Sequence, residues 1–311
     1  MILIGLLYLI FSTMTFINSK LMLGNPYPFF VGMLRAVGSG LFLLFYCKLV
    51  YKKAFLNFSL PKSAWKDLIV FGVFVHGFCM CGFSYAMQYT DPIKLCFMFA
   101  LSPFVTMMLE YFLNKEQLTI KKVIGLTVGF LGLIPVLLDA SHGAYKEVPF
   151  HLELLGAFVT FLSILFFAYG WIVMKRFLKS FSDSSIEMVN GIAMLIGGIV
   201  SFLLFIISSK GHIFSLTLSD DFGWLALAFV VSSLITYMLY PYLLKTYSAT
   251  FMSFAGFLEP VFGLFIGVVF FGSQLTRLSL VSLAVLFLGL YIYYVEEMRI
   301  HHDKMKKNPN L

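Results

Sequence analysis

The segment PFVTMMLEYFLNKEQLT, residues 103–119, recurs in altered form 157 residues later as PVFGLFIGVVFFGSQLT, residues 260–276. Each copy begins with a proline inside an apolar run and ends in Gln-Leu-Thr. At the same offset, Gly132-Leu133 aligns with Gly289-Leu290. A constant offset close to half of the 311-residue chain predicts an internal repeat of two halves. Chance agreement is the alternative, because apolar sequence draws on few residue types.

The chain as a whole divides into apolar segments of a length that suits a lipid bilayer. Of its residues, 60% are hydrophobic and 12% are charged, which is more apolar surface than a soluble domain of this size can bury. A helix needs about 20 apolar residues to cross the hydrocarbon core. Ten segments meet this requirement, at 2–19, 29–50, 67–89, 92–114, 123–139, 152–174, 186–208, 222–244, 248–271 and 279–295. They lack the alternation of a membrane β-barrel, so the sequence predicts an all-α membrane protein.

Basic residues favour one side of the membrane in this map. With a cytoplasmic N-terminus, sixteen Lys and Arg residues fall on the cytoplasmic side, five fall outside, and Arg35 lies within the second segment. Positive residues of short loops are retained on the cytoplasmic side. Both termini are therefore predicted to be cytoplasmic. The net charge of +7 follows from this topology, and no nucleic-acid partner is expected.

The two halves are predicted to enter the membrane in opposite orientations, because each contains five segments, an odd number. Their predicted bounds are residues 1–146 and 147–297, followed by a basic cytoplasmic tail at 298–311. The predicted fold is thus ten transmembrane helices arranged as two inverted five-helix repeats around a central cavity. Inverted halves of this kind are typical of secondary transporters, which bind their solute near the middle of the bilayer.

Glu259 is the first choice for a residue that contacts the solute. It is the twelfth residue of the predicted segment 248–271, and an ionised group at that depth is costly unless it is paired or solvated. We expect it to face the cavity, the alternative being a protonated or ion-paired structural residue. Pro260 follows it and can bend the helix, so Pro260 and its counterpart Pro103 are predicted hinges.

Five further residues are predicted to line a substrate site. Arg35 either contacts the solute or extends to the outer surface. His76 either titrates during transport or is a packing residue. Tyr85, Trp171 and Tyr237 supply aromatic faces, which together with an acid would suit a cationic or zwitterionic ligand with a planar ring.

Other classes of function find little support in the sequence. The four cysteines lie in apolar runs without a Cys-x-x-Cys or a nearby group of histidines, so neither disulfides nor a metal site are expected. No cofactor is expected either. An intramembrane enzyme would need paired carboxylates or a nucleophile with its base, and Asp-Asp-x-x-Asp, His-Glu-x-x-His and Gly-x-Ser-x-Gly are all absent. A channel remains the alternative among non-enzymes.

Several short motifs, in their order and spacing, resemble the EamA-like branch of the drug/metabolite transporter superfamily. They are Asn18 to Lys20, Arg35, Tyr85-Ala86, Tyr89-Thr90, Pro103, Leu113 to Thr119 with Glu116, and Glu259-Pro260. The resemblance covers roughly residues 5 to 295. The second half departs from the pattern with Ser273 in place of Glu116, so neither loop position is assigned a role.

The resemblance implies a ten-helix transporter of the bacterial inner membrane, with the fifth and tenth helices at the periphery. It implies a secondary carrier of a small metabolite, working as an exchanger or coupled to an ion. A chain rich in Phe and Ile is compatible with an AT-rich genome of an intracellular bacterium, where similar proteins exchange S-adenosylmethionine for S-adenosylhomocysteine. Export of amino acids or drugs is the alternative within the family. The expected partners are the solute and the lipid bilayer, with a monomer and a homodimer both left open.

Overall fold

The computed structural model describes residues 2–22, 27–50, 60–114, 119–138, 148–181, 185–209, 221–246, 252–253, 255–272 and 274–307. These residues are almost entirely helical and contain no β-strand. The helices are α1 (Ile2–Met22), α2 (Pro28–Val50), α4 (Lys62–Phe71), η1 (Gly72–Cys79), α5 (Met80–Ala86), α6 (Pro92–Phe99), α7 (Ser102–Asn114), α8 (Ile120–Leu138), α9 (Phe150–Ser180), α10 (Ile186–Ser209), α11 (Phe222–Thr246), α13 (Leu258–Phe271) and α14 (Arg277–Lys307).

Each of the ten predicted membrane segments corresponds to one of these helices or to a short run of them. Eight described spans are long and apolar enough to cross a membrane, with α4, η1 and α5 forming one of them and α6 and α7 another. Helix α8 has 19 residues, and the apolar helix α13 has 14. The prediction of an all-α membrane protein is confirmed.

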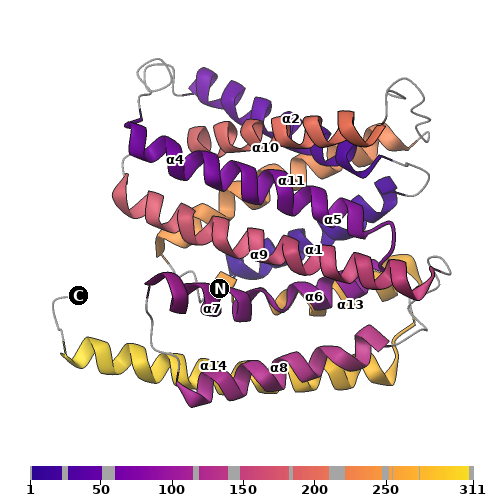
Figure 1. Cartoon of the computed structure of the whole chain (residues 1–311), viewed down its shortest axis with the longest axis vertical. Coiled ribbons are helices and arrows are strands. Elements are labelled where there is room, and N and C mark those ends of the chain that lie inside the picture. Colours follow the sequence, from indigo (N-terminus) through magenta and orange to yellow (C-terminus); the bar gives the residue numbers. More distant parts are fainter. Residues whose placement is uncertain are drawn as a thin grey trace.

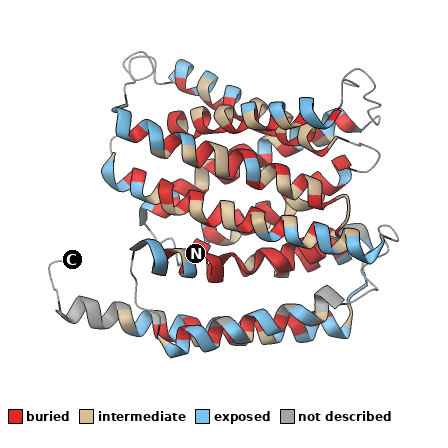
Figure 2. Cartoon of the chain, viewed as in Figure 1, coloured by how far each residue is buried: buried red, intermediate tan, exposed pale blue. Residues whose placement is uncertain are grey.

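The helices lie side by side in a bundle, and α8 and α14 form an outer pair at one edge (Figure 1). Helices α6, α7 and α13 follow as the next layer, and α1 lies deeper in the bundle, behind α9 in this view. Buried residues concentrate in these inner helices, whereas α8 and α14 show many exposed positions (Figure 2). Exposed apolar side chains such as Trp224 and Phe270 suit a lipid environment. The peripheral position of the fifth and tenth segments agrees with the resemblance.

The second segment of one half packs against the second segment of the other, in antiparallel fashion. Along α2 the contacts run from Gly32, which lies near Ser201 of α10, to Gly40, which lies near Gly191. Later residues of α2 therefore contact earlier residues of α10, as in two helices that run in opposite directions.

The fifth and tenth segments repeat this relationship at the outer pair. A Cβ atom at Gly125 of α8 would lie 3.0 Å from the backbone nitrogen of Tyr293 of α14, and one at Gly132 would lie 2.8 Å from that of Leu286. These two helices also cross in opposite directions. Corresponding helices of inverted halves run in opposite directions, so both contacts are compatible with the predicted repeat.

The fourth and ninth segments are both interrupted just before their shared proline. Helix α6 ends at Phe99 and α7 begins at Ser102, and a turn at residues 256–257 precedes α13. Pro103 and Pro260 thus occupy the first turn of a helix, where the missing N–H costs no helical hydrogen bond. The sequence predicted a bend within a continuous helix at Pro260, and the structure instead begins a new helix there.

The third segment is π-helical in its middle, over the eight residues of η1. A Cβ atom at Gly72, its first residue, would lie 2.6 Å from the carbonyl oxygen of Ala193, so the segment packs closely on α10. His76 lies within this π-helix. Such turns are rare and are frequent at functional sites, and the sequence had not predicted this one.

The predicted orientation depends on parts of the chain outside the described residues. The boundary at 146/147 and the connections that carry Lys52, Lys115 and Lys210 belong to these parts. Helix α14 continues to Lys307, so the predicted tail at 298–311 is largely helical where it is described.

Candidate functional site

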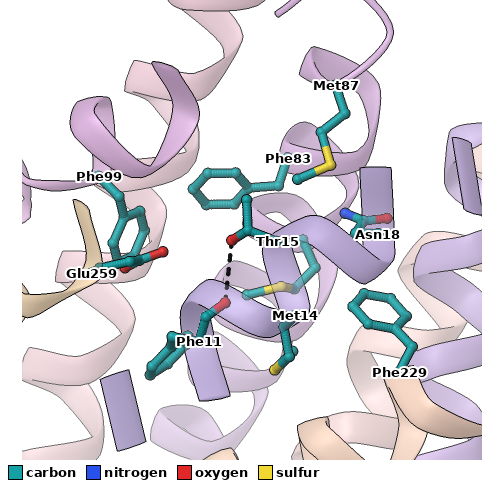
Figure 3. Close-up of a pocket in the computed structure, with 10 residues that line it drawn as sticks. Phe11, Met14, Thr15, Asn18, Phe83, Met87, Phe99, Phe229 and Glu259 are labelled. Carbon is teal, nitrogen blue, oxygen red and sulfur yellow. Dashed lines mark hydrogen bonds between the residues drawn. The ribbon is translucent and has the colours of Figure 1, made fainter. Parts of the chain in front are cut away.

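A small cavity opens among the inner helices. Its walls come from α1, α5, α6, α11 and α13, together with the turn that follows α5. The lining residues are Phe11, Met14, Thr15, Asn18, Met80, Phe83, Met87, Phe99, Phe229 and Glu259. Figure 3 shows Glu259 on one side of the cavity, with Asn18 and Phe229 on the other. Most of the lining is apolar or aromatic, so the few polar groups would orient a ligand.

Glu259 is the one carboxylate of this lining. It is the second residue of α13, and only 4% of its surface is exposed. Its Oε2 atom has no hydrogen-bond partner, and no described basic residue forms an ion pair with it. The carboxylate points towards Thr15 (Figure 3). A buried acid with unused acceptor capacity is able to pair with a cationic group.

The backbone that leads through the turn at residues 256–257 into α13 is held by side chains of neighbouring helices. The Tyr8 hydroxyl donates to the carbonyl of Met252, and the Ser12 hydroxyl donates to the carbonyl of Glu259 at 2.9 Å. On the other side, the hydroxyls of Thr106 and Ser253 lie 3.0 Å apart. Irregular backbone at membrane depth is tolerated where protein groups satisfy it. These contacts fix the position of Glu259 at the cavity wall.

The opposite wall carries the polar side chain of Asn18. Its Nδ2 atom donates to the Ser84 hydroxyl at 3.1 Å, which ties α1 to α5. Met14, Met80 and Met87 line the same cavity. Thioether side chains are flexible and polarizable, and they adapt to ligands of different shape.

Behind Phe11 lies a buried group of stacked aromatic rings. Trp171 of α9 stacks on Tyr240 of α11, with ring centroids 3.9 Å apart, and lies parallel to Tyr237 at 6.3 Å. The Phe11 ring meets both tyrosines edge-on at 6.2 Å. The indole Nε1 of Trp171 has no hydrogen-bond partner. This group supports the cavity wall rather than lining the cavity itself.

Arg35 and His76 also pack against Tyr237. Both side chains are fully buried, so the alternative in which Arg35 extends to the outer surface is wrong. The Arg35 Nη2 atom donates to the carbonyl of His76 at 3.4 Å, and its guanidinium carbon lies 5.4 Å from the centre of the Tyr237 ring. The His76 ring packs edge-on against the same tyrosine, at 4.6 Å between centroids.

Of the six residues predicted to bind substrate, five lie together in or next to the cavity. Glu259 lines it, and Arg35, His76, Trp171 and Tyr237 form a connected buried group behind its wall. Tyr85 lies apart from them near the end of α5, where its half-buried ring stacks on Phe29 at 6.0 Å.

Sequence reasoning did not assign the polar lining residues Thr15 and Asn18 or the aromatic Phe229. Asn18 had been noted as part of a family motif but had not been placed at the site. A polar residue inside an apolar segment is the signal that points to such positions. Phe229 carries no such signal, because phenylalanine is common throughout the chain.

A partly polar cavity inside a bundle of apolar helices, bordered by interrupted helices, is the arrangement of a membrane transporter. The sequence matches the EamA-like transporter family over residues 1–138 and 154–295. The chain therefore belongs to this family and is a multi-pass membrane protein. Its family consists of transporters, and the expectation that the chain is not an enzyme is confirmed.

The chain is similar along nearly its whole length to two chlamydial proteins named S-adenosylmethionine/S-adenosylhomocysteine transporter. It is 29% identical to the one from Chlamydia muridarum over 291 residues, which are 92% of this chain and 88% of the relative. It is 28% identical to the one from Chlamydia trachomatis serovar L2 over 293 residues, 92% and 86% of the two chains. A known crystal structure matches the fold with a TM-score of 0.67 at 18% identity, covering 96% of this chain and 97% of that one.

Proposed function

We propose that this protein exchanges S-adenosylmethionine for S-adenosylhomocysteine across the inner membrane of a bacterium. The names of the chlamydial relatives suggest the substrate pair. The observation that carries the proposal is the position of Glu259, a buried carboxylate that lines an aromatic cavity and has no ion-pair partner within the described part of the chain.

The chemistry of the substrate fits this lining. S-adenosylmethionine has a positively charged sulfonium and an ammonium group, and either would pair with the Glu259 carboxylate. Its adenine ring is planar and would stack on aromatic side chains such as Phe11, Phe83 and Phe99, which line the cavity. A cation near these rings gains cation–π attraction in addition.

Alternating access is the mechanism that the helix arrangement supports best. Corresponding helices of the two halves pair in antiparallel fashion, and the fourth and ninth segments are interrupted at equivalent prolines. Two inverted halves can exchange conformations and so open the site first to one side and then to the other. Pro103 and Pro260 are the proposed hinges of this movement.

Transport in liposomes tests the proposal directly. Purified protein is reconstituted in vesicles that contain S-adenosylhomocysteine or buffer, and uptake of radiolabelled S-adenosylmethionine is measured. We expect saturable uptake that is faster with S-adenosylhomocysteine inside, whereas a channel would give uptake that neither saturates nor accelerates. Uptake of a labelled amino acid or drug in place of S-adenosylmethionine would favour the alternative substrates of the family.

The variant Glu259→Gln tests the proposed role of the carboxylate. It removes the negative charge with little change of shape, and we expect the affinity for S-adenosylmethionine to fall about tenfold or more. Glu187→Gln is the matched control, because Glu187 lies in the first turn of α10 and does not line the cavity. Unchanged affinity in Glu259→Gln would remove this residue from the binding site.

A further inference from the structure

Arg35 is a fully buried cation that has no carboxylate partner among the described residues. Its Nε and Nη1 atoms lack any hydrogen-bond partner, and Nη2 donates to the carbonyl of His76 over a long distance of 3.4 Å. A guanidinium has five N–H donors in a planar fork that matches a carboxylate. Most of this capacity is unused.

The groups around Arg35 also have unused hydrogen-bonding capacity. Neither imidazole nitrogen of His76 has a partner, although the ring is fully buried. The rings of Tyr237 and Phe229 lie 5.4 and 6.0 Å from the guanidinium carbon and attract the cation without neutralising it. An unpaired buried charge is costly in a protein interior and more so in a membrane. An anion that enters during the transport cycle would offset that cost.

Two side chains link the Arg35 group to the cavity. Phe229 lines the cavity, and the centre of its ring lies 6.0 Å from the guanidinium carbon of Arg35. Met80 also lines the cavity, and its sulfur lies 3.6 Å from the Tyr237 hydroxyl of the Arg35 group. Phe229 stands across the cavity from Glu259 (Figure 3). The molecule therefore has an acid at one side of the cavity and an unpaired cation behind the opposite wall.

We propose that Arg35 binds the carboxylate of an α-amino-acid moiety of the ligand once Phe229 and Met80 move aside. This inference rests on the proposed function, because both exchanged ligands carry such a moiety. Only S-adenosylmethionine carries the sulfonium charge, so contacts with Glu259 differ between the two. The carboxylate is common to both, and Arg35 gives the site a contact that is kept when one ligand replaces the other.

Binding of ligand pairs with and without the carboxylate tests the role of Arg35. Affinities of the purified, detergent-solubilised protein are measured for S-adenosylmethionine, S-adenosylhomocysteine and the decarboxylated form of each, which lacks the carboxylate and keeps the amino group. We expect the wild-type protein to bind each carboxylate ligand about 10- to 100-fold more tightly than the analogue that lacks it, as for the loss of a charge-assisted hydrogen-bonded pair. In Arg35→Gln this preference should disappear, while the affinity for decarboxylated S-adenosylmethionine stays within about threefold of the wild-type value.

Controls separate this role from a purely structural one. Arg176→Gln removes an arginine that is 63% exposed and does not line the cavity, and this variant should retain the preference. If Arg35→Gln fails to fold, the ligand preference of the wild-type protein and of Arg35→Lys still tests the proposal. Lysine keeps the charge and loses the bidentate geometry, so Arg35→Lys should show a weaker preference for the carboxylate ligands. Equal loss of affinity for both members of each pair would overturn the proposal.

Two further outcomes distinguish this proposal from its alternatives. If the wild-type protein binds no adenosyl ligand, the proposed function fails, and amino acids are then compared with their decarboxylated amines. A preference for the amino acids that depends on Arg35 would uphold the carboxylate site with another substrate, and its absence would overturn it. If ligand affinity depends on chloride and is the same with and without the ligand's carboxylate, Arg35 is a site for an inorganic anion and the proposal is overturned.

Discussion

The side-chain amide of Asn190 on α10 donates a hydrogen bond to the backbone carbonyl of Tyr237 on α11. In a regular helix this carbonyl would accept from the N–H group four residues later. That residue is Pro241, which lies inside α11 and has no N–H. Asn190 thus supplies the donor that the proline removes, at the residue whose ring contacts both Arg35 and His76.

Asn190→Ala should destabilise the protein by about 1–3 kcal/mol, because it leaves a buried carbonyl without a donor. The double variant Asn190→Ala/Pro241→Ala should lose less stability than the sum of the two single variants. The alanine at position 241 supplies a backbone N–H that can donate to the carbonyl of Tyr237. Thermal or denaturant unfolding of the four proteins in detergent gives the coupling free energy. Strictly additive effects would show that Asn190 acts elsewhere.

Gly289→Ala should also destabilise the protein, through the crossing of α8 and α14. A Cβ atom there would lie 2.6 Å from the carbonyl oxygen of Gly125, and backbone cannot move aside as a side chain does. We expect a loss of about 1–3 kcal/mol, the usual range for overpacking. Gly223→Ala is the matched control, because nothing lies within 4 Å of its added methyl group. Equal stability of the two variants would contradict the close approach.

The sequence was sufficient to predict the helices because their length and composition follow from the thickness of the bilayer. Glu259 was equally accessible to prediction, because an acid deep in an apolar segment is rare enough to indicate a site. The repeat pointed to equivalent positions, and Pro103 and Pro260 do lie at equivalent helix breaks.

Contacts between helices that are distant in sequence were beyond this reasoning. The unpaired state of Arg35 depends on which residues of η1 and α11 surround it, and no local pattern specifies them. The π-helix at His76 begins at Gly72, which packs closely on α10, and this contact between distant segments leaves no local pattern in the sequence. Tyr85 is a case where the residue type suggested a substrate contact, whereas the fold packs its ring against Phe29.

Two ion pairs attach α9 of the second half to helices of the first half, and they should differ in strength. Lys94 and Glu153 lie 2.6 Å apart with the lysine side chain only 7% exposed, whereas Arg176 of the pair with Asp67 is 63% exposed. Glu153→Gln leaves a buried ammonium without its partner and should cost about 1–3 kcal/mol. Asp67→Asn leaves an exposed guanidinium and should cost about 0–1 kcal/mol.

Unfolding measurements at low and high salt would check this comparison. The contribution of the exposed pair should fall with salt, and that of the Lys94 pair should change little. A larger loss of stability in Asp67→Asn than in Glu153→Gln would mean that the burial of Lys94 does not determine how much the Lys94–Glu153 pair stabilises the protein.

Pro260→Ala tests whether the interrupted ninth segment moves during transport. Alanine restores an N–H and favours helix, so it should stabilise a longer helix across the turn at residues 256–257. We expect the exchange rate to fall about tenfold if one conformation gains about 1.4 kcal/mol over the other, with ligand affinity at equilibrium changed far less. Pro135→Ala is the control, since Pro135 lies inside the peripheral helix α8. Because that helix has no part in the proposed movement, Pro135→Ala should leave the rate unchanged, and an equal loss in both variants would argue against a hinge at Pro260.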